Sequence, residues 1–166
     1  MFQNQVYVNP ANALPGDFAS SNPMIYKLSA TGKMIADASG VTIGKFAVLN
    51  ADGTVTSVPG AAPSSTTRIG FVHREMNAQI TAFLAENGYT IAKGMPVALF
   101  GTGDFWVNAD VVSGSPARGT AILWDTVTGN TNIGGTVSAT LIATGYSLVD
   151  ESASVGGLVR ITNTGA

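Results

Sequence analysis

The strongest local pattern lies in residues 86–109, which read ENGYTIAKGMPVALFGTGDFWVNA. Apolar residues fall into short runs of about 4–8 residues, a length typical of strands. Thr90, Ile91 and Lys93 lead into one run at residues 95–99, and residues 105–107 form the next, with a turn at residues 101–104 between them. Glycine and aspartate between two such runs favour a β-hairpin. We therefore predict a hairpin with its turn at residues 101–104.

An earlier stretch, residues 39–58, repeats part of this pattern. Both stretches contain G-x-T-I-x-K, at residues 40–45 and 88–93. Glycine permits a turn with positive φ, and β-branched Thr and Ile suit a pleated, half-buried surface. Asp52 and Gly53 supply the turn of the earlier copy. We interpret the echo as one hairpin plan used twice, and nothing in it requires catalysis.

Further strands are expected along the rest of the chain, at residues 24–28, 34–36, 68–75, 120–124, 136–144 and 157–162. Gly129 and Asn130 form a second hairpin signal. Residues 79–86 fit either helical or strand spacing, and we favour a strand because their surroundings are β. Short strands at regular spacing predict an all-β fold, a single β-barrel or β-sandwich-like domain of short antiparallel strands and hairpins.

The N-terminal residues 1–23 differ from the rest. Pro10, Pro15 and Pro23 remove backbone donors, so neither a helix nor a central strand can persist. A disordered tail is one interpretation. The segment nevertheless carries more apolar anchors than a disordered tail usually has: Phe2, Val6, Tyr7, Val8, Leu14 and Phe18. We expect an extended, ordered arm over residues 1–23 and a β-domain over residues 24–166.

Composition limits the class of protein. The 166 residues suffice for one domain, and only 11% are charged, against roughly 25% in a typical soluble domain. Small residues that replace charge can pack against another protein without desolvating an ion. The 8 Lys and Arg form no cluster and the net charge is −2, so direct nucleic-acid binding is not expected. No apolar run of about 18 residues predicts a membrane span.

The chain offers little chemistry. His73 is the only histidine and there is no cysteine, so we predict no catalytic, cofactor-binding or metal-binding residues, and no cofactor. His73, Arg74 and Glu75 are successive residues of one predicted strand and cannot converge on one face. Sequence spacing leaves a glycosidase carboxylate pair open, because such a pair is assembled in space. Phe105 and Trp106 must face opposite sides, so one should be core and the other, taken as Trp106, a contact residue.

Four phrases carry a resemblance to a known family: GDFASSNP at residues 16–23, GVTIGKFA at 40–47, GFVHRE at 70–75 and GDFWV at 103–107. Together they resemble the structural cement, or capsid decoration, proteins of tailed bacteriophages. The similarity runs from about residue 16 to residue 107, and the last third shares only its β character.

The resemblance implies a non-enzymatic virion protein that binds the major capsid protein on the outside of the capsid shell and stabilises it against internal DNA pressure. It implies that Gly16, Asp17, Phe18, Asn22 and Pro23 contact the capsid or a neighbouring copy, and that His73, Arg74 and Glu75 lie at a polar contact. Shell geometry suggests a homotrimer. The alternative is a carbohydrate-binding or head-fibre-like β-module that presents Trp106, Trp124 or Tyr146 to host surface glycans.

Overall fold

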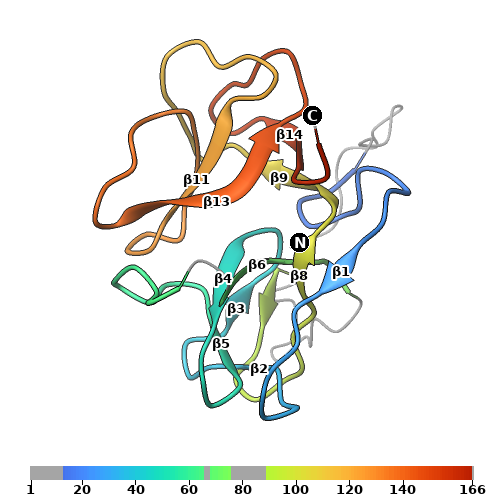
Figure 1. Ribbon diagram of the computed structural model, residues 1–166, viewed down its shortest axis with the longest axis vertical. Coiled ribbons are helices and arrows are strands. Elements are labelled where there is room, and N and C mark those ends of the chain that lie inside the picture. The colour runs from blue at the N-terminus through green and yellow to red at the C-terminus, as the bar shows by residue number, and fades with distance from the viewer. Residues whose placement is uncertain (1–12, 66–67, 76–88, 166) are drawn as a thin grey trace, which may run out of the picture.

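The computed structural model describes residues 13–65, 68–75 and 89–165 (Figure 1). Two six-stranded sheets make up most of it. The first sheet has the order β1-β8-β6-β4-β5-β2. Its strands are β1 (Ile25–Tyr26), β2 (Ile35–Ala36), β4 (Phe46–Leu49), β5 (Thr54–Thr56), β6 (Ile69–Val72) and β8 (Leu99–Thr102).

The second sheet follows the first in sequence and has the order β10-β12-β11-β13-β14-β9. It consists of β9 (Asp104–Asn108), β10 (Val111–Val112), β11 (Ala121–Asp125), β12 (Thr131–Ile133), β13 (Leu141–Leu148) and β14 (Leu158–Thr162). A small ribbon pairs β3 (Val41–Thr42) with β7 (Thr90–Ile91). The all-β prediction is confirmed, although two pairs, β2 with β5 and β10 with β12, are parallel.

The predicted hairpin at residues 101–104 is wrong. β8 pairs with β6 and β1 in the first sheet, whereas β9 pairs with β14 in the second. Between them Gly103, at φ 144°, carries the chain from one sheet to the other. A Cβ there would lie 2.9 Å from Cζ of Phe105, so only glycine fits. The Gly-Asp signal marks a change of backbone direction, but local sequence does not say which strands will pair.

The echo between residues 40–45 and 88–93 also has a different meaning from the predicted double hairpin. The two copies pair with each other, Val41 opposite Ile91 and Thr42 opposite Thr90. Thr42 and Thr90 hold the same position in the repeated pattern, so the ribbon has a local two-fold relation. Only the first copy continues into a hairpin, β4 with β5.

Other predicted turns and strands can be compared directly. The hairpins with turns at Gly53 and Gly129 are present, and both glycines have positive φ. The strand predicted at residues 136–144 is displaced, because β13 spans Leu141–Leu148. The Ser138 hydroxyl accepts a hydrogen bond from the Leu141 amide, a side-chain-capped turn that delays the strand. Residues 79–86 lie outside the described residues.

The larger hydrophobic core is shared by both sheets. Phe71 of the first sheet and Phe105 of the second stack with centroids 4.5 Å apart, and Phe46 meets Tyr146 edge-on at 5.4 Å. Trp124 is fully buried in the same cluster. A second cluster lies within the first sheet and its ribbon, around Val41, Val72 and Leu99. Each sheet thus buries its inner face mainly against the other.

Phe105→Ala should therefore weaken the whole fold. The ring is fully buried between the sheets, and removing a buried phenylalanine side chain costs about 3–5 kcal/mol. Urea unfolding followed by tryptophan fluorescence would measure the change. The exposed Val137 provides a control, because Val137→Ala should change the free energy of unfolding by less than about 0.5 kcal/mol. Equal effects from both variants would contradict a shared core.

Candidate functional site

The described part of the N-terminal segment, residues 13–23, lies along the free edge of β9. The Gly16 amide donates to the Trp106 carbonyl at 2.8 Å, and the Trp106 amide donates to the Asp17 carbonyl at 2.9 Å. The Ala19 amide donates to the Asp104 carbonyl at 2.9 Å. Phe18 forms an antiparallel bridge with Phe105. The segment therefore covers an edge that would otherwise expose unpaired backbone groups.

The same segment also bonds to the first sheet. The Gly16 carbonyl accepts the Arg74 amide at 3.0 Å and lies 2.7 Å from Nδ1 of His73. Because a carbonyl only accepts, the His73 proton sits on Nδ1 in this contact. The Arg74 guanidinium and the Asp17 carboxylate are 3.7 Å apart and both well exposed, so this ion pair adds little stability. One backbone turn at Gly16 thus joins the ends of both sheets.

Two glycines make the close approach of this segment feasible. Gly16 has φ 94°, and a Cβ on it would lie 2.9 Å from Cγ2 of Ile43 and 3.0 Å from Cβ of Arg74. On the facing chain, a Cβ on Gly44 would lie 2.8 Å from the Pro15 backbone. Two backbones pass each other at Gly16 and Gly44 because neither position carries a side chain.

Aromatic rings pack over the contact between Gly16 and His73. The Phe18 ring stacks on His73 with centroids 3.8 Å apart and contacts Phe100 and Phe105 at 5.4 and 5.6 Å. Burial lowers the pKa of His73, and it outweighs the opposite effects of the Gly16 carbonyl, Glu75 and Asp17. His73 therefore remains neutral to lower pH than a free histidine. The contact is fully stable above the ordinary histidine pKa and weakens as pH falls through the lowered value.

Asp104 anchors the end of the segment. Its carboxylate accepts hydrogen bonds from Ser20 and Asn22, each at 2.6 Å. From the C-terminal strand and the residues after it, Thr162 donates at 2.5 Å and Thr164 at 3.0 Å. Burial acts to raise the pKa of Asp104, but the side-chain hydrogen bonds together outweigh it and lower the pKa. This buried carboxylate ties the N-terminal segment, β9 and β14 together.

We define the N-terminal junction as Gly16, Asp17, Phe18, His73, Arg74, Asp104 and Trp106. Of the contact residues predicted from sequence, Gly16, Asp17, Phe18, His73, Arg74 and Trp106 meet there, and Asn22 reaches it through Asp104. Glu75 is half-buried beside it and Pro23 is exposed. Sequence reasoning missed Asp104 and Gly44. The Gly103-Asp104 pair looked like turn chemistry, and no local signal indicated four distant donors.

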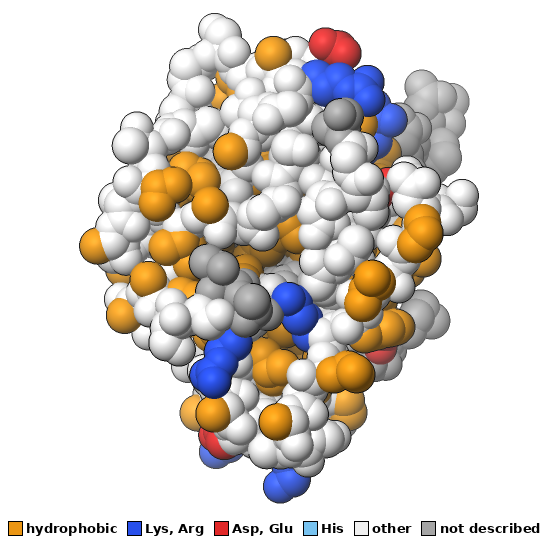
Figure 2. Space-filling model, in the orientation of Figure 1, with side chains coloured by type: hydrophobic (Ala, Val, Ile, Leu, Met, Phe, Trp, Pro, Cys, Tyr) orange, Lys and Arg blue, Asp and Glu red, His pale blue; other side chains and the backbone are white. Residues whose placement is uncertain are grey.

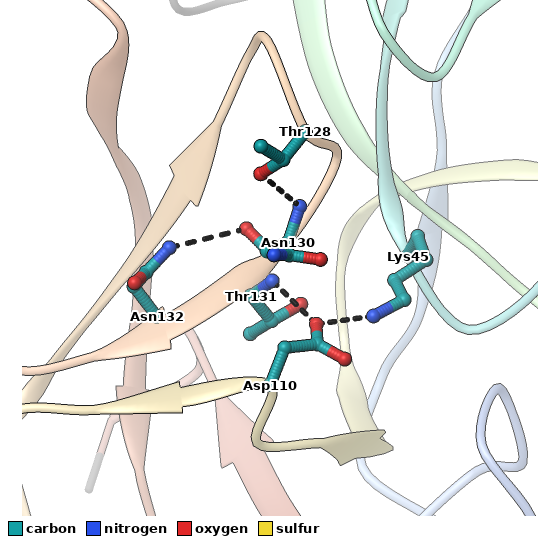
Figure 3. A network of polar contacts seen from close by, with 6 residues as sticks. All are labelled: Lys45, Asp110, Thr128, Asn130, Thr131 and Asn132. Carbon is teal, nitrogen blue, oxygen red and sulfur yellow. Dashed lines mark hydrogen bonds and ion pairs between the residues drawn. The ribbon is translucent and has the colours of Figure 1, made fainter. Parts of the chain in front are cut away.

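A second polar link also joins the two sheets (Figure 3). Lys45, just before β4, forms an ion pair with Asp110, which follows β9. The same carboxylate accepts the Thr131 amide of β12 at 2.7 Å. Figure 3 also shows the Asn132 amide group donating to the Asn130 carbonyl beside this link. Asp110 thus holds the chain between β9 and β10 of the second sheet against Lys45 of the first.

The described residues hold few chemical features beyond such links. They contain no group of three or more His, Asp or Glu side chains placed to bind a metal ion. Within these residues, no helix could span a bilayer.

Trp124 and Tyr146 are buried in the core, which overturns their expected exposure in the glycan-binding alternative. Trp106 is partly buried, with the Arg160 guanidinium 5.8 Å from its ring centre. Phe105 is the core residue of the adjacent pair, as predicted.

Two packed β-sheets, joined by polar links and by a backbone junction at their edge, define an all-β protein. A sequence profile of the XM1 gp53 minor capsid protein family matches residues 2–163, and the chain belongs to that family. A chain in the structure of the capsid of Myoviridae phage XM1 has the same fold, with a TM-score of 0.63. The two are 14% identical over 98% of this chain and 96% of the other. No curated protein matches the chain. The chain is therefore a phage capsid structural protein.

Asp104→Asn should destabilise the junction. The asparagine NH₂ group cannot accept a hydrogen bond, so some of the four donors lose their partner. At neutral pH we expect a loss of about 1–3 kcal/mol in the free energy of unfolding. Because the wild-type pKa is lowered, the charge stabilises above the ordinary aspartate pKa of about 3.9, and this stabilisation is lost as pH falls through the folded value.

Urea unfolding of both proteins across the acidic range would measure this loss. The difference should shrink as Asp104 becomes protonated in the wild type. A difference that stays constant down to strongly acidic pH would show that the carboxylate charge does not hold the junction.

Proposed function

We propose that this protein is a capsid decoration, or cement, protein that binds the outer surface of the major capsid protein shell. In this role it stabilises the shell against the pressure of packaged DNA. Membership in a minor capsid protein family is the observation that carries the proposal. A virion subunit of this kind needs adhesive surface and a rigid body, and no catalytic group.

The surface of the chain supports this role. Several large apolar side chains are exposed although only 11% of the residues are charged. On the face drawn in Figure 2, uncharged side chains predominate and the charged ones are few. A broad contact of low charge avoids the cost of desolvating ions at an interface. Adhesion of this type spreads the binding free energy over area instead of concentrating it in ion pairs.

The N-terminal junction supports the role mechanically. Backbone hydrogen bonds join residues 16, 17 and 19 to β9, and Gly16 also bonds to Arg74, just after β6. A force on one sheet is therefore transmitted to the other. A protein that holds shell subunits together must transmit force without opening its own sheets. The residues predicted from sequence to contact the capsid or a neighbouring copy would then act at this rigid junction or beside it. They are Gly16, Asp17, Phe18, Asn22, Pro23, His73, Arg74, Glu75 and Trp106.

We also propose that three copies assemble on the shell. A standard contact patch buries about 800 Å² per partner, and three linked patches gain through effective concentration. Size-exclusion chromatography with light scattering would report the mass in solution. A strictly monomeric species that also binds shells as single copies would contradict the trimer and leave the decoration role intact.

Binding to shells tests the decoration role directly. Purified protein is mixed with DNA-filled shells that lack it, sedimented, and the shells are heated while DNA release is followed with a dye. We expect saturable co-sedimentation and DNA release at a higher temperature. At a free concentration of 100 times Kd, binding should stabilise each occupied site by about 2.7 kcal/mol.

An unrelated protein of similar size and charge serves as the control and should neither sediment with the shells nor change the release temperature. Failure of the wild-type protein to bind would refute the decoration role. Binding without a change in the release temperature would leave a surface-attached protein with no stabilising function.

A further inference from the structure

The N-terminal segment reaches the first sheet through an exposed connection. The Ala19 amide bonds to β9 of the second sheet, and β1 of the first sheet begins at Ile25. Residues 20–24 between them are all exposed and lie outside the strands. Figure 1 shows this stretch in blue as it leaves the second sheet and enters β1. Pro23 disfavours a helical backbone for Asn22 and favours an extended one, so the segment is tied to its own β1 by an extended piece of chain.

The segment holds its own local shape. The Leu14 amide donates to Oδ2 of Asp17 at 2.9 Å, and the Asp17 amide donates to the Leu14 carbonyl at 3.1 Å. Because these bonds are local, the turn of residues 14–17 does not depend on which β9 edge it meets. Phe18 follows as the apolar anchor, with its ring on His73 and against Phe105. The segment is a preformed docking element whose receptor is the rest of the N-terminal junction.

Within one chain, the junction groups already have partners. The Gly16 amide and carbonyl bond to Trp106 and Arg74, and the Asp104 carboxylate accepts from four side chains. A neighbouring copy therefore cannot add to these contacts while the chain's own segment occupies them. It can share them only if its own segment takes the place of this one.

We propose that neighbouring copies of this chain exchange residues 13–23, so that the segment of one copy pairs with β9 of the next. The donor contributes Gly16 and Phe18, and the receiving copy contributes His73, Asp104 and Trp106. Each junction then contains residues of two chains. Exchange of an identical element is a low-cost route to assembly, because the contacts are those of the single chain. This inference rests on the proposed decoration role and names how neighbouring copies are joined.

Local concentration decides between the closed and the exchanged arrangement. Because the junction bonds are the same in both, the closed chain is favoured by the effective concentration that its connection provides, about millimolar for a short flexible linker. Copies bound side by side on one shell meet at a comparable local concentration, whereas dilute free copies do not. Residues 13–23 span about 36–40 Å when extended, at 3.3–3.6 Å per residue, which is long enough to cross to an adjacent copy.

Engineered disulfides distinguish the two arrangements, and the chain has no cysteine of its own to interfere. Asp17 and Arg74 lie on the two sides of the junction, with their charged groups 3.7 Å apart and well exposed. Free Asp17→Cys/Arg74→Cys protein, oxidised at low micromolar concentration, should form the disulfide within one chain and run as a monomer on a non-reducing denaturing gel. The same variant, bound to shells in reducing buffer and then oxidised, should give about tenfold more covalent multimer than the free protein.

A second cysteine pair repeats the test with other residues. Ser20 and Thr164 both donate to the Asp104 carboxylate, at 2.6 and 3.0 Å, so Ser20→Cys with Thr164→Cys should behave in the same way. Asp17→Cys with Val137→Cys is the control. Val137 is exposed in the loop before β13, and β14 separates β13 from β9, so this pair should form no disulfide above background.

The position of the disulfide on the shell decides the outcome. Disulfides that stay within one chain on the shell, for both cysteine pairs, would overturn the exchange and leave the decoration role intact. Covalent multimers at the same level from the Val137 control would also overturn it, because they would report crowding on the shell and not pairing at the junction. If the wild-type protein does not sediment with shells, the decoration role and the exchange both fail.

Discussion

The stack of Phe71 on Phe105 is the contact on which the architecture depends. It joins residues from different sheets at 4.5 Å in a core where both rings are fully buried. Neither sheet could bury its inner face alone, because strands of two to eight residues offer too little apolar surface. The crossover at Gly103 follows from this requirement, since it places β8 and β9 in separate sheets on either side of the shared core.

The N-terminal junction connects the two sheets a second time, in addition to the shared core. The Gly16 carbonyl accepts from the first sheet while the Gly16 amide donates to the second. Asp104 adds four side-chain hydrogen bonds that reach from Ser20 to Thr164. His73 and Asp104 both have lowered pKa values, so the junction loses stability in the same direction, toward acid. An assembly subunit built in this way keeps its two sheets in a fixed relation at neutral pH.

Three acidic side chains of this phage capsid structural protein make structural links. The carboxylates that might have suggested catalysis have structural tasks: Asp104 binds the junction, Asp110 pairs with Lys45, and Asp150 pairs with Arg160. Of the three aromatic residues in the glycan-binding alternative, Trp124 and Tyr146 are core residues and Trp106 is partly buried. The exposed large apolar side chains include Ile25, Tyr26 and Leu28, in and just after β1.

The sequence by itself determined the β class, the turns at Gly53 and Gly129, and the resemblance to phage capsid proteins, because these depend on neighbouring residues and on local backbone preference. It also marked most of the residues that meet at the N-terminal junction, although as contacts with another protein. Only the tertiary structure decided that the echoed motifs pair with each other, that residues 101–104 cross between sheets, and that Asp104 collects four donors. Those outcomes depend on contacts between residues far apart in the chain. The local sequence of a two-residue strand does not choose its partner, and the strand pairs with the edge that buries the most apolar surface.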